Sequence, residues 1–280
     1  MSLTTTPTGA AFGVRVAGAD LSAPLTPALT EEIRDLLHTH QVLIFPGQSL
    51  SQEALIAFSR PFGSLQLSVY DRFTDRAHPE VLVLSNVTRD GKPIGIDKFG
   101  RTWHTDLSYM ACPTYATMLY AVEVPEVGGE TNYASMVAAY EALEPERQAK
   151  LRGERFIHSL TRQHEIYFPK NFISDEQKAR APDVAHPVVR THPATGRKAL
   201  YLGGEHIAFP ENLPYEAGHE YLMEMIRYAT QPRFTYRHDW AVGDLVMWDN
   251  QSVMHQATPF DGAVYRRVMY RTSIEGGVPA

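Results

Sequence analysis

Short apolar runs recur along the whole chain and are separated by Gly, Pro, Asn and Asp. Runs of this length, rich in β-branched and aromatic residues and bounded by turn-forming residues, are typical of β-strands. The segments that this pattern predicts to be strands are 12–16, 42–45, 81–84, 115–124, 188–191, 199–202, 234–236, 245–248 and 268–274.

Fewer segments have a helical period. Residues 27–38 place their apolar side chains on one stripe, with Thr26 as a suitable N-cap and Pro27 in the first turn. Further helices are predicted at 51–60, 135–143 and 215–229. Because strands and helices do not alternate regularly, a doubly wound parallel sheet fits poorly. The pattern favours a mainly β fold with flanking helices, specifically a double-stranded β-helix (jelly roll) whose mouth can hold a ligand.

The composition is that of a globular protein, with 44% hydrophobic and 21% charged residues. No repeat or Pro/Gly/Ser linker divides the chain, so one domain is predicted over residues 1–280. A formal charge of −6 without a basic cluster argues against a nucleic-acid partner or an anionic membrane surface. No run approaches the ~20 apolar residues that span a bilayer.

The cellular location is predicted from two weaker signals. Cys112 is the only cysteine, so no intrachain disulfide can form, and the N-terminus lacks the basic and apolar regions of a secretory signal. A cytoplasmic location is expected. The sequence is compatible with a homo-oligomer but does not indicate one.

The candidate metal ligands are His104 and Asp106, which are separated by one residue, and His255, which lies far downstream in the sequence. In an extended segment, His104 and Asp106 would share one face. If a distant strand brought His255 beside them, two imidazoles and one carboxylate would leave open coordination positions on a metal ion, which suits non-haem Fe(II). The same ligand types also suit Zn(II), so a zinc hydrolase is an alternative.

Arg267 and Arg271 lie at the last predicted strand. In an extended strand they would share a face and lie about 13 Å apart, where they could bind two anions on either side of one metal ion. Arginine presents paired N–H donors that match carboxylate or sulfonate groups. Arg266 directly precedes Arg267, and a one-residue shift in register would exchange the faces of these two side chains.

Several segments together resemble one family, the Fe(II)- and 2-oxoglutarate-dependent dioxygenases of the taurine dioxygenase and aryloxyacetate dioxygenase type. The resemblance runs in order along nearly the whole chain and is therefore more specific than any single motif. The matching segments are 43–48, Trp103-His104-Thr105-Asp106, Gly128-Gly129-Glu130-Thr131, 138–143, 186–193, 243–250 with His255, and 266–271.

The resemblance implies roles for particular residues. Fe(II) would be bound by His104, Asp106 and His255. The co-substrate 2-oxoglutarate would chelate the iron, and Arg267 with Thr131 would bind its far carboxylate. The enzyme would use O2 to convert 2-oxoglutarate to succinate and CO2 while it hydroxylates a substrate C–H bond. Where the hydroxylated carbon also bears oxygen or sulfur, the C–O or C–S bond would then break.

The resemblance also bears on the substrate. Arg271 matches the arginine that binds the substrate's carboxylate or sulfonate, so a small-to-medium organic anion is expected, either an aryloxyalkanoate-like carboxylate or an alkylsulfonate. Ser68 and Gly100 stand approximately where taurine-specific relatives have histidine and asparagine, although a taurine-type enzyme stays an alternative. Aromatic residues that could line a larger pocket are Tyr70, Phe73 and Phe99.

A third class is a catalytically silent jelly-roll binding or sensor domain that has kept the pocket. A zinc hydrolase would not need Thr131, Arg267 and Arg271 in register with the metal ligands, whereas the dioxygenase does.

Overall fold

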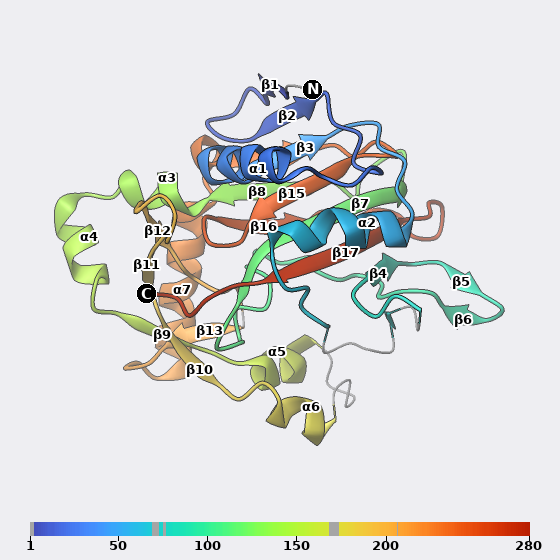
Figure 1. The fold of residues 1–280 in the computed structure, drawn as a ribbon. Coiled ribbons are helices and arrows are strands. Elements are labelled where there is room, and N and C mark those ends of the chain that lie inside the picture. The colour runs from blue at the N-terminus through green and yellow to red at the C-terminus, as the bar shows by residue number, and fades with distance from the viewer. Residues whose placement is uncertain (1–2, 69–72, 75–76, 168–173, 206) are drawn as a thin grey trace.

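The computed structural model describes residues 3–68, 73–74, 77–167, 174–205 and 207–280. Within these residues the largest element is a seven-stranded sheet (Figure 1). All of its neighbouring strands are antiparallel except the second and third, which are parallel. The strands in order across the sheet are β1 (Thr4–Pro7), β2 (Val14–Ala17), β3 (Val42–Phe45), β15 (Leu245–Asp249), β7 (Thr114–Glu123), β17 (Val268–Glu275) and β4 (Leu82–Ser85).

A smaller antiparallel sheet packs against one face of this large sheet. It consists of β14 (Thr235–His238), β8 (Thr131–Ser135) and β16 (Val253–Ala257). Apolar side chains from both sheets form one buried cluster, to which Leu119, Trp248 and Met269 contribute from the large sheet and Tyr133 and Val253 from the small one. The core therefore lies between the sheets, where burial of apolar surface stabilises both.

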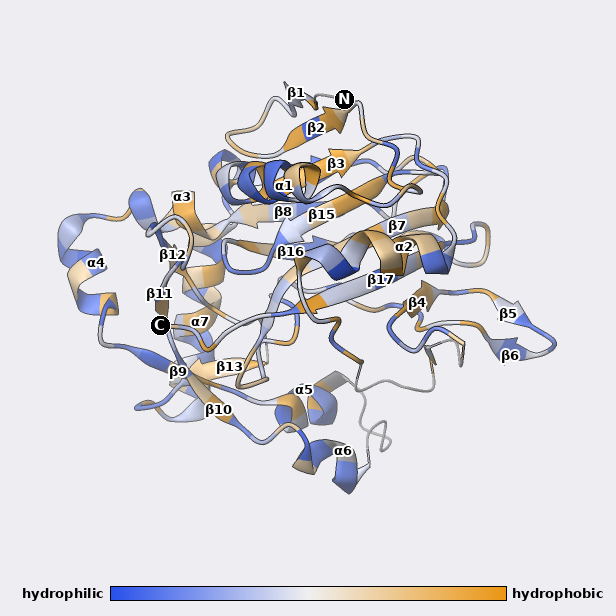
Figure 2. Cartoon of the chain, viewed as in Figure 1, coloured by the Kyte–Doolittle hydropathy of each residue, from blue (hydrophilic) through white to orange (hydrophobic). Residues whose placement is uncertain are grey.

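The remaining strands form smaller sheets and a hairpin. Their bounds are β10 (Val184–Pro187), β9 (Arg155–His158) and β13 (Ala208–Pro210) in one sheet, β11 (Val189–Thr191) and β12 (Lys198–Leu200) in another, and β5 (Thr88–Arg89) with β6 (Lys92–Pro93). Figure 2 shows the contrast in hydropathy between the apolar strands of the large sheet and the mainly hydrophilic β5–β6 hairpin.

Helices cover the outer face of the large sheet and the end where β11 and β12 lie. Ile33 and Leu37 of α1 (Pro27–His40) and Leu55 of α2 (Gln52–Ser59) pack against Phe45 and Met247 of the sheet. The Thr26 hydroxyl accepts a hydrogen bond from the Leu29 backbone N–H, as expected for an N-cap. The other helices are η1 (Arg60–Phe62), α3 (Met136–Glu141), α4 (Pro145–Leu151), α5 (Leu160–Tyr167), α6 (Asp175–Ala179), α7 (Tyr215–Ala229) and η3 (Pro232–Phe234).

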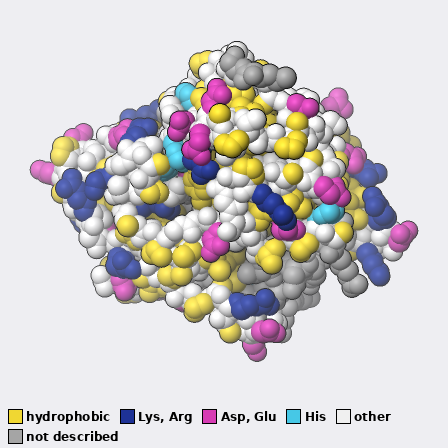
Figure 3. All heavy atoms as spheres, in the orientation of Figure 1, with side chains coloured by type: hydrophobic (Ala, Val, Ile, Leu, Met, Phe, Trp, Pro, Cys, Tyr) yellow, Lys and Arg dark blue, Asp and Glu magenta, His cyan; other side chains and the backbone are white. Residues whose placement is uncertain are grey.

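The prediction of a mainly β fold with flanking helices is confirmed, and α7 has the predicted bounds. Eight short strands were not predicted, because polar residues or prolines interrupt or replace their apolar runs: β1, β5, β6, β8, β9, β10, β13 and β16. No helix in the part of the chain that the structure describes is long and apolar enough to cross a membrane. Basic and acidic side chains are interspersed on the face that Figure 3 shows.

Candidate active site

His104 and His255 are held opposite each other by their backbones. The His104 N–H donates to the His255 carbonyl at 3.0 Å, and the His255 N–H donates to the His104 carbonyl at 2.9 Å. This reciprocal pair places the two imidazole rings 4.2 Å apart between their centroids. Gly204 lies on the other side of His104, where a Cβ would approach the His104 Cβ to 2.9 Å, so a side chain there would displace the histidine.

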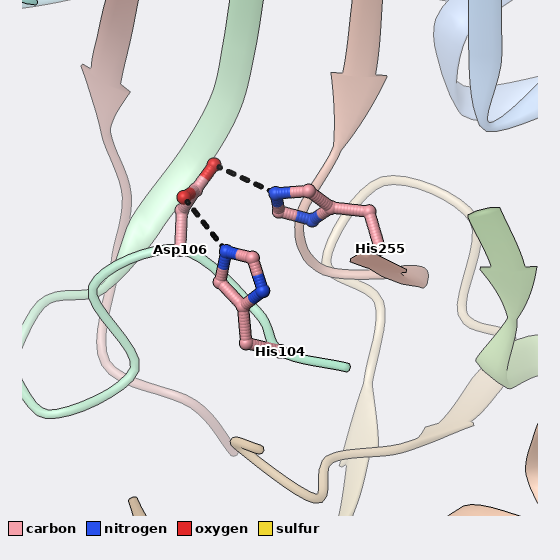
Figure 4. Close-up of side chains that lie close together, drawn as sticks. All are labelled: His104, Asp106 and His255. Atoms are coloured by element: carbon pink, nitrogen blue, oxygen red, sulfur yellow. Dashed lines mark ion pairs between the residues drawn. The ribbon is translucent and has the colours of Figure 1, made fainter. Parts of the chain in front are cut away.

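Asp106 completes a convergent set with the two histidines (Figure 4). Its Oδ1 lies 3.8 Å from Nε2 of His104, and its Oδ2 lies 3.7 Å from Nε2 of His255. Residues 104–106 do not form a regular strand: His104 makes an isolated bridge and Asp106 begins a turn. The side chains nevertheless converge, because the turn directs Asp106 back toward the histidine pair.

Both imidazoles are in the form that binds metal ions. Burial and the neighbouring His104 lower the pKa of His255 to about 3, although the Asp106 charge opposes this shift. Burial also lowers the pKa of His104. The Thr102 carbonyl lies 2.8 Å from Nδ1 of His104; because a carbonyl can only accept, Nδ1 carries the proton and Nε2 presents its lone pair toward Asp106.

Asp106 is held as a carboxylate. Burial raises its pKa, but the charge of Arg271, the neighbouring His255 and His104 side chains and a hydrogen bond from Thr117 outweigh burial and bring the pKa to about 2. The Thr117 hydroxyl donates to Oδ2 at 2.7 Å, and Nη1 of Arg271 donates to Oδ1 at 3.0 Å.

This donor set fits a divalent transition metal. One ligand atom from each of His104, Asp106 and His255 lies within 4.8 Å of the others. Two imidazole nitrogens and one carboxylate oxygen suit ferrous iron and leave coordination positions for other ligands. Among the described residues, no other cluster of three or more His, Cys, Asp or Glu side chains has this geometry.

Arg267 points inward and Arg266 points outward. The exposed Arg266 pairs with Glu123 at 3.1 Å. The buried Arg267 immediately precedes β17, and its backbone N–H donates to Oδ1 of Asn86 at 2.9 Å, which anchors it to the segment after β4. The structure therefore adopts the register that directs Arg267, and not Arg266, toward the cavity beside His104 and His255.

The Arg267 guanidinium is an incompletely paired buried cation. Its Nε has no hydrogen-bond partner among the described residues, and burial lowers its pKa to about 10, with the charge of Arg101 acting in the same direction. A buried charge of this kind is costly unless an anion compensates it. It faces a cavity that is lined by Leu84, Phe99, Gly100, His104, Leu119, Thr131, Trp248, His255, Ala257, Arg267 and Arg271.

Thr131 and Arg271 reach the same cavity from different strands. Thr131 begins β8, and its hydroxyl accepts a hydrogen bond from Nε1 of Trp240 at 3.0 Å, which leaves the hydroxyl proton available to an acceptor in the cavity. Arg271 of β17 lies 5.7 Å from the centre of the Phe99 ring and contacts Asp106 directly. Met269, between the two arginines, is buried in the inter-sheet core. Arg267 precedes β17, whose register with β7 shifts between Val268 and Met269, yet Arg267 and Arg271 line the same cavity.

A second, larger cavity lies beside His104 and has a volume of about 380 Å³. Its lining residues are Lys98, Phe99, Gly100, Arg101, Thr102, His104 and Gln163. Of the aromatic residues expected to line a pocket, Phe99 does so, Phe73 packs against the inter-sheet core, and Tyr70 lies outside the described residues.

Three further residues that contact the site residues were not singled out by the sequence patterns. Thr117 contacts Asp106, Asn250 contacts both Thr117 and the Asp106 backbone, and Trp240 contacts Thr131. Asn250 lies in the Trp248-Asp249-Asn250 segment that carried the family resemblance, so that motif was the one available signal.

The chain belongs to the family described as taurine catabolism dioxygenase TauD, TfdA family, whose model matches residues 4–273. This confirms the predicted resemblance and the prediction of an enzyme of the dioxygenase class.

Relatives extend over essentially the whole chain. The alpha-ketoglutarate-dependent 2,4-dichlorophenoxyacetate dioxygenase of Cupriavidus pinatubonensis is 36% identical over 99% of this chain and 100% of its own length. The (S)-phenoxypropionate/alpha-ketoglutarate-dioxygenase of Sphingobium herbicidovorans is 33% identical over 96% of this chain and 94% of its own. A crystal structure of AAD-2 in complex with Mn(II) and N-oxalylglycine is 32% identical, has a TM-score of 0.87, and is matched over 100% of this chain and 98% of that one.

Proposed function

We propose that the protein is an Fe(II)- and 2-oxoglutarate-dependent dioxygenase that hydroxylates a small-to-medium organic anion. The observation that carries the proposal is the convergence of His104, Asp106 and His255 within 4.8 Å, beside a cavity that also receives Arg267 and Thr131. The two imidazoles and the carboxylate would bind the metal. The relatives named for alpha-ketoglutarate, a synonym of 2-oxoglutarate, support the choice of co-substrate.

Arg267 and Thr131 would bind the far carboxylate of 2-oxoglutarate. The buried guanidinium, with Nε unpaired among the described residues, gains a counter-anion, and the Thr131 hydroxyl can donate because Trp240 already donates to it. When bound, the ferrous ion would supply the reaction with O2 that converts 2-oxoglutarate to succinate and CO2 and hydroxylates a substrate C–H bond. The protein's own residues bind and orient both organic molecules.

The substrate would lie in the 380 Å³ cavity beside His104, which shares Phe99, Gly100 and His104 with the smaller cavity that Arg271 lines, and its anionic group would be directed toward Arg271. Such a volume is in the range of small-molecule sites. The glycine at position 100 and the Phe99 ring leave room for an aromatic substrate, and both relatives described above are named for aryloxyalkanoates. An aryloxyalkanoate-like carboxylate is therefore favoured over an alkylsulfonate, and hydroxylation next to the ether oxygen would cleave the C–O bond.

We also infer that residues 1–280 form a single domain of the jelly-roll type, because the two facing sheets share one hydrophobic cluster. A cytoplasmic location and independence from nucleic acids and membranes stay predictions, and the oligomeric state is left open. The same donor set also suits Zn(II), but a zinc hydrolase would not require the buried Arg267 and Thr131 at the same cavity. A silent binding domain that kept the pocket would bind 2-oxoglutarate without forming succinate.

One experiment tests the class, and a second tests the substrate. Anaerobic addition of Fe(II) and 2-oxoglutarate should produce a metal-to-ligand charge-transfer colour that neither gives alone, and a His255→Ala variant should lack it. No colour with the wild-type chain would refute the class. A panel of aryloxyalkanoates, alkylsulfonates including taurine, sulfate esters and other carboxylates should then show which compound stimulates succinate formation.

A further inference from the structure

Asn250 has an amide orientation that its neighbours determine. The Asp106 backbone N–H and the Trp248 Nε1–H both point at the same Asn250 side-chain atom, each at 3.2 Å. Both groups are donors only, so the atom that they face must be the amide oxygen. The Asn250 Nδ2 group therefore faces the other way, toward the Thr117 hydroxyl, to which it donates at 2.9 Å.

The orientation of Asn250 fixes the direction of the Thr117 hydroxyl in turn. A threonine hydroxyl has one proton, and here its oxygen already accepts from Asn250. Its proton is therefore directed to its second neighbour, Oδ2 of Asp106, at 2.7 Å. Thr117, Asn250 and Asp106 are all buried, so water does not compete for these hydrogen bonds.

Hydrogen bonds to the neighbouring residue, Asp249, hold the turn that carries Asn250. The buried carboxylate of Asp249 accepts from the Gln251 backbone N–H at 2.9 Å and from the Ser252 hydroxyl at 2.9 Å. It also lies 2.8 Å from Nε2 of His192, whose Nδ1 accepts backbone N–H groups and so leaves the proton on Nε2. These hydrogen bonds hold the turn between β15 and β16 in place at Asn250.

We propose that Asn250 and Thr117 are positioning residues that orient the Asp106 carboxylate toward the histidine pair. They act through a hydrogen-bond relay of fixed direction, from Asn250 through Thr117 to Asp106. This inference rests on the proposed metal site. The relay sets the rotation of the carboxylate about its Cβ–Cγ bond, because Oδ2 is tied to strand β7 while the backbone of Asp106 is tied to Asn250. Hydrogen-bond partners of metal ligands orient those ligands, and their loss typically weakens metal binding about 10–100-fold.

The test measures Co(II) binding by the metal-free full-length chain. Thr117→Val keeps the shape of the side chain and removes the proton, and we expect it to weaken Co(II) binding about 10–100-fold. Thr117→Ser keeps the hydroxyl and should restore most of the affinity. The matched control is Thr114→Val, because Thr114 is also buried on β7 but donates its hydroxyl proton to Gln66 at 2.8 Å.

A double-mutant cycle separates the relay from general destabilisation. Because Asn250 acts partly through Thr117, the effects of Asn250→Ala and Thr117→Val on Co(II) affinity should be less than additive. Thermal unfolding of the metal-free variants should show similar decreases in Tm for Thr117→Val and Thr114→Val. If Thr117→Val does not fold, Thr117→Ala replaces it.

Two results would contradict the inference in distinguishable ways. If Thr117→Val bound Co(II) as tightly as Thr114→Val, the relay would be refuted and the proposed function would stand. If the wild-type chain bound no Co(II) at one ion per chain, the proposed function would fail and the relay with it.

Discussion

Arg271 donates a hydrogen bond from Nη1 to Oδ1 of Asp106 at 3.0 Å, so the arginine proposed to bind the substrate anion directly contacts a proposed metal ligand. Both side chains are buried, and the remaining Nε of Arg271 has no hydrogen-bond partner in the described part of the chain. A single guanidinium can therefore stabilise the Asp106 carboxylate and still offer N–H groups to a second anion in the cavity.

The first prediction concerns this arginine. Arg271→Gln should raise the KM for the primary anionic substrate on the order of tenfold or more, because a hydrogen bond to a charged group contributes about 1.5–3 kcal/mol. It should leave the KM for 2-oxoglutarate nearly unchanged. Steady-state kinetics with the best substrate of the panel would measure both constants. An unchanged substrate KM would mean that the anion is bound elsewhere, for example at Arg101.

The second prediction uses the adjacent pair of arginines as test and control. Arg267→Gln should raise the KM for 2-oxoglutarate on the order of tenfold or more, because the charge-assisted hydrogen bonds to the far carboxylate are lost. Arg266→Gln should have little effect, since Arg266 is exposed and its partner Glu123 lies outside the cavity. Equal effects of the two substitutions would argue against the proposed role of Arg267.

The third prediction concerns stability. Arg267→Met should not destabilise the ligand-free chain and should raise its Tm if packing is kept, because the substitution removes a buried cation that lacks full pairing. Added 2-oxoglutarate should raise the Tm of the metal-loaded wild type but not of Arg267→Met. A large loss of stability in the variant would show that Arg267 is already compensated within the protein.

The fourth prediction removes a proposed metal ligand. His255→Ala should abolish stoichiometric Co(II) binding and turnover, because only one imidazole and one carboxylate would remain. His40→Ala, at the end of α1, is the control and should retain both properties. Retained metal binding in His255→Ala would place the ion at a different set of ligands.

The fifth prediction is a pH dependence of stability. Burial lowers the pKa of His104, His158 and His255 in the folded chain, whereas an unfolded chain has histidines of ordinary pKa near 6.5. Below that pH the unfolded chain binds more protons, so the free energy of unfolding should fall as pH decreases, by up to ~1.4 kcal/mol per pH unit for each such histidine.

Urea unfolding of the metal-free chain at pH 7.5, 6 and 5 would measure this dependence. A free energy of unfolding that stayed constant between pH 7.5 and 5 would contradict the assignment of neutral buried histidines.

Much of the fold could be predicted because its central strands are nearly continuous apolar runs. Val42–Phe45 is buried along its whole length and was predicted with the observed bounds. Strand β16 was not predicted, because His255 and Gln256 interrupt its apolar run. These two polar residues obscured the strand pattern of β16. Only the ordered motifs of the family resemblance connected His255 to His104.

The side-chain partners of the site could not be read from the sequence. Thr117 reads as an ordinary strand residue, and its contact with Asp106 exists only because β7 passes behind the turn that begins at residue 106. The strand pattern alone left Arg266 and Arg267 open, and the family resemblance favoured Arg267. The structure fixes the register through Asn86 and through the pairing of β17 with β4 and β7. Tertiary packing determines both the contact between Thr117 and Asp106 and the register of Arg267.

The reciprocal backbone pairing of His104 with His255 has an evolutionary consequence. The segment 98–102, which Trp103 separates from His104, contributes most of the wall of the larger cavity yet contains no regular strand or helix. Replacement of the Lys98, Phe99 or Arg101 side chain would change which compounds enter, while the pairing of His104 with His255 depends on main-chain atoms. Gly100 is the exception, because a Cβ there would lie 3.1 Å from Cε1 of His104. New specificities can thus arise around an unchanged histidine pair.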